Sequence, residues 1–177
     1  MTPQEKFTQE QVQVEQDHHT PTAGAMDGHV LANLKIHQQK LLQAANAVSG
    51  MESLMLRRLL MDLTEQEGKW YLNLLQNLWD LGESVPTMTN EFIEYTMLQE
   101  NGSLKYETNE NLLAEISADL VTQTLFTSRA IKLAEKEDKL GLRQINLDLH
   151  NWLVHQVKII QGLRGKNVQA AFDEDED

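Results

Sequence analysis

Apolar residues recur at helical spacing along most of the chain. Four such stripes follow one another, over residues 29–49, 53–81, 109–139 and 141–165. No proline falls inside any of them, because the chain has only Pro3, Pro21 and Pro86. No stretch alternates between apolar and polar positions, so strands are not expected. The pattern predicts an all-α protein with four long helices.

The connections between the stripes predict how the helices are joined. The first and second stripes, and the third and fourth, are separated by short segments, so each pair forms an antiparallel hairpin. Residues 82–107 make a long crossover between the hairpins and contain a short helical piece over residues 91–99. Two hairpins joined by a long crossover form a ferritin-like four-helix bundle.

The second stripe is wide. Leu59, Leu72, Leu75 and Trp79 broaden its apolar face. Such a width indicates burial on two sides, inside a bundle and against another subunit. A thick single core would give the same pattern, and the pattern alone does not decide between the two.

The N-terminal segment, residues 2–17, is rich in Gln and Glu. Thr2 suits an N-cap, and Pro3 suits the first position of a helix. Its few apolar residues form a face too thin to fold alone, so the segment is a peripheral helix or a disordered arm. With a loop predicted at residues 18–28, the chain divides into an arm with its hinge loop (1–28), a bundle (29–166) and an acidic tail (167–177).

The charge of the chain is −12 and is concentrated at its ends. Residues 1–29 hold one Lys against five acidic residues, and residues 173–177 are all acidic. DNA repels such a chain, because non-specific binding depends on Lys and Arg neutralising phosphates. The chain lacks Cys, has no apolar run of the ~18–20 residues that cross a bilayer, and begins with a polar segment. A cytoplasmic protein without a membrane partner is therefore expected.

A cluster of candidate metal ligands flanks the predicted hinge. Five ligand-type side chains fall within thirteen residues: Asp17, His18, His19, Asp27 and His29. Carboxylate and imidazole groups suit Zn, Fe, Mn or Ni, and a loop can bring both ends of the cluster together. The hypothesis is a divalent-cation site that fixes the arm to the first bundle helix. The alternative is a solvated loop with His as a polar filler.

The remaining histidines carry weaker signals. An intra-subunit di-iron centre needs a Glu-x-x-His pair on each of two helices, and the only such pair, Glu15 with His18, precedes the bundle. His37, His150 and His155 are isolated on helices. Each is more simply a hydrogen-bonded core residue than a metal ligand.

The stretch from Leu31 to Glu100 resembles the Dps family of the ferritin-like superfamily. The resemblance is in the helix lengths, in the Gly50 and Gly82 helix ends, and in the crossover helix around Glu91-Phe92-Ile93-Glu94. It covers most of the chain and is greatest for the branch found in lactic-acid bacteria. It implies a hollow dodecamer, non-specific DNA binding, protection in stress, including oxidative stress, and a nucleoid-associated location.

The resemblance also locates the family's inter-subunit iron ligands. The corresponding positions here, counted from Gly50, are Ala45, Arg57, Met61, Leu72 and Gln76. Alkyl, thioether and amide groups bind iron poorly, and Arg57 adds a permanent positive charge. The resemblance therefore implies the family's shell without its standard ferroxidase centre. No organic cofactor is implied, and a bound divalent cation or iron stays open.

The family binds DNA through Lys-rich N-terminal arms, and this arm departs from that pattern. Its candidate DNA contacts are Lys6, its only base, with Gln4, Gln9 and Gln11. Many arms on one particle give multivalency. Divalent cations bridging acidic groups to phosphates are the favoured route, and this route predicts that a chelator removes DNA binding.

Other possibilities remain open at this stage. Glu137, Asp138 and Asp148 correspond to the region where similar chains line a three-fold pore with carboxylates. Solvated charge at a helix end is the alternative. For the whole chain, the alternatives are an iron-oxidising mini-ferritin with a non-standard site and a pure assembly protein without metal or nucleic acid.

Overall fold

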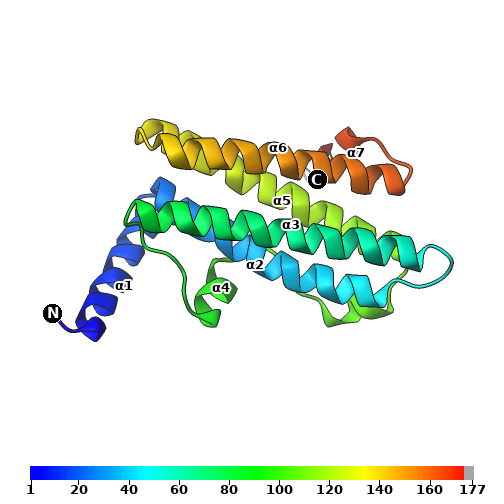
Figure 1. The fold of residues 1–177 in the computed structure, drawn as a ribbon, viewed down its shortest axis with the longest axis horizontal. Coiled ribbons are helices and arrows are strands. Elements are labelled where there is room, and N and C mark those ends of the chain that lie inside the picture. Colours follow the sequence, from blue (N-terminus) through cyan, green and yellow to red (C-terminus); the bar gives the residue numbers. More distant parts are fainter. Residues whose placement is uncertain (174–177) are drawn as a thin grey trace.

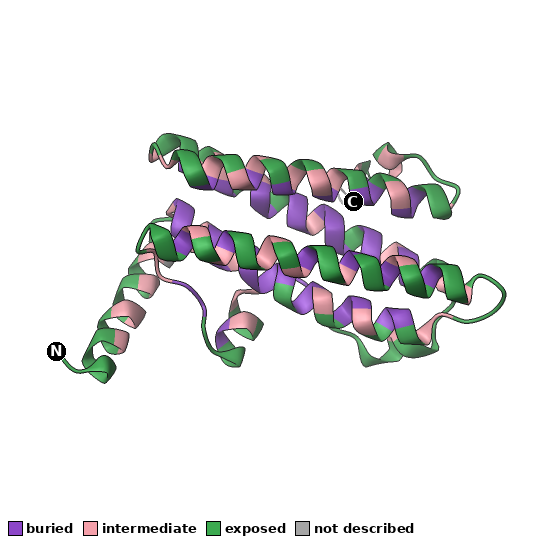
Figure 2. Ribbon diagram, in the orientation of Figure 1, coloured by how far each residue is buried: buried purple, intermediate pink, exposed green. Residues whose placement is uncertain are grey.

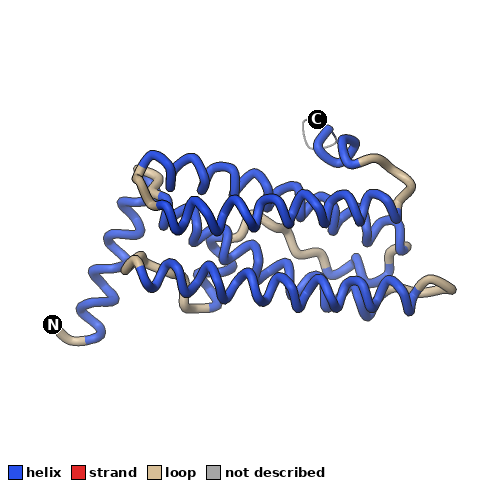
Figure 3. Tube along the Cα trace, turned by 45° about the horizontal axis from the view of Figure 1, so that its top comes forward, coloured by secondary structure: helices blue, strands red, loops and turns tan. Residues whose placement is uncertain are grey.

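The computed structural model describes residues 1–173, apart from the side chain of His18. Within this range the secondary structure is helical, without strands (Figure 3). The helices are α1 (Pro3–His19), α2 (Ala23–Ala47), α3 (Ser53–Asp80), α4 (Thr89–Tyr95), the 3₁₀ helix η1 (Gly102–Tyr106), α5 (Asn109–Lys136), α6 (Leu140–Leu163) and α7 (Val168–Asp173). The all-α prediction is confirmed.

The four long helices form two antiparallel hairpins that pack into one bundle (Figure 1). Helix α2 pairs with α3, and α5 pairs with α6, while α2 and α5 also pack against each other between the hairpins. The crossover from α3 to α5 carries α4 and η1, and both of these lie against α2. This is the ferritin-like arrangement that the sequence predicts.

The core is a cluster of apolar residues, many of them leucines, to which all four long helices contribute. Leu34, Leu60, Leu120 and Leu153, one from each helix, are fully buried. Figure 2 shows the buried faces of the helices turned toward one another. Burying each such side chain contributes roughly 1.5–3 kcal/mol to the stability of the fold, so the burial of these leucines stabilises the packing of the two hairpins.

Polar contacts fix the crossover to α2. The Asn33 side-chain oxygen accepts hydrogen bonds from Met97 N at 2.8 Å and from Thr96 Oγ1 at 3.1 Å. About two turns further along α2, Lys40 Nζ donates to the Gln99 carbonyl at 2.7 Å. The end of α4 and the segment after it are therefore anchored by buried side chains.

Helix α2 begins at Ala23 rather than at His29, so the predicted hinge loop is wrong for residues 23–28. Thr22 caps the helix by accepting a hydrogen bond from Ala25 N at 3.1 Å. The glycines that suggested a loop have a packing role, since a Cβ at Gly24 would lie 2.2 Å from Glu83 Oε2. The loop between arm and bundle is confined to the residues between α1 and α2.

Helix α3 begins at Ser53, where the second stripe begins, and its N-cap Glu52 makes no side-chain capping bond. One further boundary differs from the sequence expectations. Part of the predicted acidic tail is helix α7, whose Ala171 is buried. The end of that tail, residues 174–177, lies outside the described residues.

Candidate functional site

Helix α1 is an arm that leaves one end of the bundle (Figure 1). Thr2 and Glu5 form a capping box, in which Glu5 N donates to Thr2 Oγ1 at 3.2 Å and Thr2 N donates to Glu5 Oε2 at 2.6 Å. Pro3 occupies the first helical position. The predicted helix start is confirmed, and the arm is helical rather than irregular.

The arm has an outer and an inner face. Gln4, Lys6 and Gln9, three of the candidate DNA contacts, are exposed. Gln11, the fourth, turns toward the body and donates to Glu91 Oε1 of α4 at 3.1 Å. Gln11 therefore attaches the arm, whereas the other three face outward.

The contact between arm and body is acidic. A cavity of about 30 Å³ separates them and is lined by Glu10 and Asp17 from α1, by Glu83 and Glu91 from the body, and by Tyr95. Burial and the neighbouring Glu91 raise the pKa of Glu10. Arm docking therefore becomes more favourable as the pH falls and Glu10 takes up a proton.

The structure does not bring together the four hinge residues whose side chains it describes, Asp17, His19, Asp27 and His29. Asp17 accepts a hydrogen bond from Gln13 on its own helix, and His19 lies 3.6 Å from Glu15. His29 Nδ1 is 2.7 Å from the Tyr95 carbonyl, while Asp27 is buried inside the bundle. The side chain of His18 lies outside the described part of the structure. Within residues 1–173, no group of three or more His, Asp and Glu side chains could hold a metal ion.

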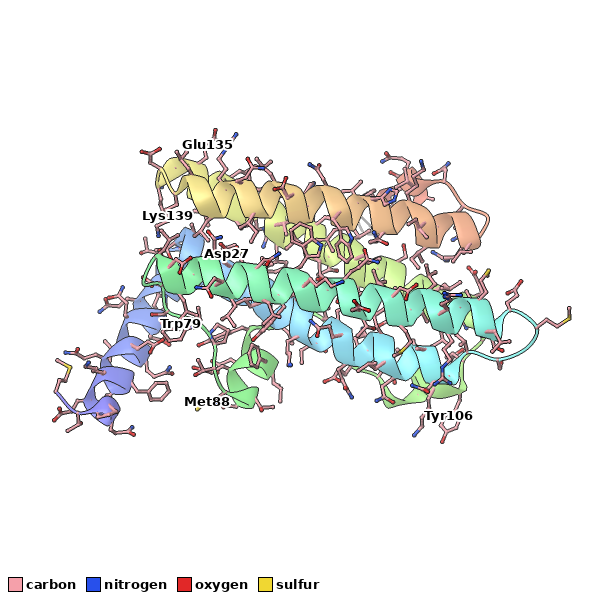
Figure 4. All side chains as sticks on the ribbon, in the orientation of Figure 1. Asp27, Trp79, Met88, Tyr106, Glu135 and Lys139 are labelled. Atoms are coloured by element: carbon pink, nitrogen blue, oxygen red, sulfur yellow. The ribbon has the colours of Figure 1, made fainter. Side chains whose placement is uncertain are left out.

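Asp27 belongs to a cluster at the end of the bundle where the arm departs. Asn146 Nδ2 donates to its Oδ1 at 2.8 Å, and burial raises the pKa of Asp27 to about 8 although that hydrogen bond opposes the shift. Figure 4 shows Asp27 and Lys139 at this end. The Lys139 ammonium lies between the carboxylates of Glu83 and Glu137. Asp27 is thus predominantly a neutral acid at pH 7.

The candidate pore residues have separate surroundings in the single chain. Glu137 Oε1 accepts a hydrogen bond from Ala23 N at 2.8 Å and so caps α2. Asp138 is exposed and adopts a left-handed conformation (φ 57°) in the turn between α5 and α6. Asp148 accepts a hydrogen bond from Gln144 at 3.0 Å. Their role in a pore stays a prediction.

The positions of the family's iron ligands lie on α2 and α3. Ala45 is buried, whereas Arg57, Met61, Leu72 and Gln76 are exposed on α3. Gln76 Nε2 donates to Asp80 within its own helix at 2.8 Å. This face of α3 presents apolar side chains, one cation and an amide.

A buried charge network lies in the centre of the bundle, and the sequence pattern did not reveal it. His37 Nδ1 of α2 is hydrogen-bonded to Glu67 Oε1 of α3 at 2.6 Å, and both side chains have no exposed surface. Lys40 Nζ lies 2.6 Å from Asp119 Oδ2 and 2.9 Å from Glu115 Oε1, both on α5. Three helices are thus joined by ion pairs inside the core.

Two groups of the network, His37 and Asp119, have raised pKa values for different reasons. Burial disfavours the imidazolium of His37, but the carboxylates of Glu67 and Asp119 outweigh burial and raise the pKa of His37. Burial raises the pKa of Asp119 against the opposing effect of His37 and Lys40. His37 and Lys40 thus lie against two buried acidic side chains, Glu67 and Asp119.

The remaining helical histidines differ in environment. His37 is the buried, hydrogen-bonded residue that the sequence predicts. His150 Nδ1 is hydrogen-bonded to Thr127 Oγ1 at 2.9 Å. His155 is exposed, so its assignment as a core residue is wrong. It lies on the solvent side of α6.

Solved structures resemble this chain over nearly its whole length. The DpsB protein of Lactococcus lactis MG1363 is 35% identical with a TM-score of 0.90, covering 94% of this chain and 96% of its own. The DpsA protein of the same organism is 32% identical with a TM-score of 0.89, covering 95% and 99%. Dps from Listeria monocytogenes shares the fold at 19% identity, with a TM-score of 0.80 and coverage of 84% and 96%.

No protein-family model matches the chain, and no curated protein matches it. None of the helices described for residues 1–173 combines the length and the apolar character that a membrane span requires. The identity to the two lactococcal proteins, over almost the full length of both chains, decides the relationship. The chain belongs to the Dps family.

Proposed function

We propose that this protein forms a hollow dodecamer that binds DNA non-specifically through its N-terminal arms, bridged by divalent cations, and protects it in stress without the family's inter-subunit ferroxidase centre. One observation carries the proposal: α1 is a capped helix that leaves the bundle and exposes Gln4, Lys6 and Gln9. A projecting helix repeated on each subunit of a particle supplies many weak contacts at once.

The surface of α3 supports assembly. Leu54, Leu72 and Trp79 are 83%, 62% and 60% exposed in the single chain. Exposed apolar side chains repeated along one helix indicate a protein interface. A second copy of the chain is the partner that membership of an oligomer-forming family favours, and its packing would bury these side chains.

The same helix supports the loss of the standard iron chemistry. The positions matching the family ligands hold Ala45, Arg57, Met61, Leu72 and Gln76, which offer no carboxylate or imidazole. Arg57 would also repel a ferrous ion electrostatically. We therefore expect no peroxide-dependent iron oxidation at this interface.

The acidic arm accounts for the cation requirement. Glu5, Glu10, Glu15 and Asp17 outnumber the single base, Lys6, on α1. Direct contact with phosphates is therefore unfavourable, and a divalent cation between carboxylate and phosphate reverses the sign of the interaction. Such a bridging cation could also be bound by one of the hinge histidines, His18, His19 or His29.

Gel retention of plasmid DNA by sized protein tests the proposal. Full-length protein with Mg²⁺ should retain DNA, and EDTA should remove that retention. A variant lacking residues 1–19 should assemble to the same size and retain no DNA by this route. Retention unaffected by both EDTA and the deletion would refute the arm as the cation-dependent contact.

The second candidate is an iron-oxidising mini-ferritin with a non-standard site. Iron would then be the substrate, and the measurement is oxidation of Fe²⁺ by peroxide, followed by absorbance. Oxidation above the protein-free rate that survives in an Arg57→Ala variant would favour this candidate over the DNA-binding one.

A further inference from the structure

Helix α5 presents a row of positive charges in an otherwise acidic chain. Arg129, Lys132 and Lys136 are exposed and follow one another at spacings of three and four residues, so they share one face of the helix. The row, called the α5 cationic stripe below, spans about 10 Å along the helix axis. One strand of duplex DNA carries about three phosphates over that length.

The stripe is not neutralised by its surroundings. None of its three residues forms an ion pair with a described carboxylate. Glu135, three residues after Lys132 on α5, has its Oε1 3.8 Å from Arg143 Nε on α6. Figure 4 shows Glu135 near the end of the bundle that also carries Lys139. Two further carboxylates follow Lys136 in the sequence, and one of them, Glu137, lies against Lys139.

Arg129 is also held in place. Its guanidinium lies over the ring of Phe126, 5.3 Å from the ring centroid. Stacking of this kind limits the side chain's freedom while leaving its N–H donors open to solvent. An ordered guanidinium loses less entropy when it binds a phosphate.

The stripe lies at the same end of the bundle as the root of the arm. Glu137, which follows α5 directly, caps Ala23 at the start of α2. Only the short loop after α1 separates that point from the arm. Figure 1 shows α1 and the C-terminal end of α5 at this shared end. The stripe therefore lies beside the root of the arm, and α1 runs from there away from α5 (Figure 1).

We propose that the α5 cationic stripe is a second DNA-contacting surface that binds backbone phosphates directly, beside the cation-dependent contact of the arm. This inference rests on the DNA binding proposed above. It divides that binding into two parts: a chelator-sensitive part from α1, and a part from α5 that weakens with monovalent salt through counterion release.

The test compares two charge-matched triple variants at a fixed Mg²⁺ concentration and increasing NaCl. One variant is Arg129→Gln, Lys132→Gln, Lys136→Gln. The control is Lys35→Gln, Lys105→Gln, Lys158→Gln, which removes the same charge from exposed positions outside α3 and α5. The stripe variant should bind DNA at least about tenfold more weakly, with a salt slope shallower by about 2–3 units, while the control matches the wild type.

Each other outcome overturns the inference in a distinguishable way. Equal affinity and salt slope in the stripe variant would show that α5 makes no contact, although arm-mediated binding survives. Equal losses in both triples would show an effect of net charge alone. A changed particle size in the stripe variant only would show that the stripe is a contact between copies. No retention by the wild type, with or without Mg²⁺, would overturn the proposed function as well.

Discussion

Replacing Lys40 by methionine removes the only ammonium in the buried network at the centre of the bundle. Lys40 Nζ lies 2.6 Å from Asp119 Oδ2, and the two side chains are 7% and 8% exposed. Methionine keeps much of the length of the side chain and none of its charge. The substitution therefore tests electrostatics with little change in packing.

The magnitude follows from the distance and the burial. At 2.6 Å and an effective dielectric constant of about 20, the attraction between Lys40 and Asp119 is about 6 kcal/mol. Desolvation of both ions offsets most of this, so the intact pair adds little net stability. Removing Lys40 leaves the buried Asp119 with only the more distant His37, 3.8 Å away, to offset its charge, and breaking such a pair costs about 3–5 kcal/mol. The double variant Lys40→Met, Asp119→Asn should recover most of that loss.

Thermal unfolding at one protomer concentration and neutral pH measures the effect. For a chain of this length, Lys40→Met should lower the midpoint by about 6–20 °C. The control is Lys69→Met, which removes the exposed ion pair between Lys69 and Glu65 on α3 and should leave the midpoint unchanged within error. A midpoint for Lys40→Met equal to that of the control, or no recovery in the double variant, would refute the reasoning.

Three pH effects follow from the remaining titratable groups. Because the pKa of His37 is raised in the folded protein, its protonation contributes folding stability that is complete below about pH 6.5 and is lost as the pH rises through the folded pKa. In a Glu67→Gln variant, the unfolding midpoint should decline less steeply with rising pH. Asp27 keeps its proton up to about pH 8 in the folded protein but loses it near pH 4 in the unfolded chain. The free energy of unfolding of Asp27→Asn should therefore rise, relative to that of the wild type, by about 1.4 kcal/mol per pH unit between about pH 4 and 8. A difference that stays constant with pH would contradict a buried, neutral Asp27. Glu10→Gln should dock the arm more tightly at neutral pH, seen as slower amide exchange in α1, and equal exchange would show that repulsion by Glu91 is negligible.

The sequence predicts those features that depend on neighbours along the chain. The four stripes repeat within single helices, and the capping box joins Thr2 to Glu5, so both could be recognised from spacing alone. The prediction of a loop over residues 23–28 is wrong because glycine, which occurs twice in this segment, is also common in loops. Only the contact between Gly24 and Glu83 in the folded chain gives the reason for a glycine inside the helix.

The sequence does not predict contacts between residues on different helices. His37, Glu67 and Asp119 come from α2, α3 and α5, and no spacing along the chain links them. In the sequence each has the pattern of an ordinary helical residue, and only the packing of the bundle places the three in contact. The hinge residues show the converse: Asp27 and His29 are near Asp17 in sequence, but helix α2 carries them onto separate partners, Asn146 and Tyr95.

The interior and the surface of this protein therefore hold their charges differently. In the interior, His37 and Lys40 lie against the carboxyl groups of Glu67, Asp119 and Glu115, so basic and acidic groups are paired there. On the surface, the acidic α1 and the α5 cationic stripe carry opposite charges at one end of the bundle. A polyanion approaching that end meets a repulsive arm and an attractive helix face. Under the two proposals above, DNA binding would depend on divalent cations at the arm and on monovalent salt at the stripe.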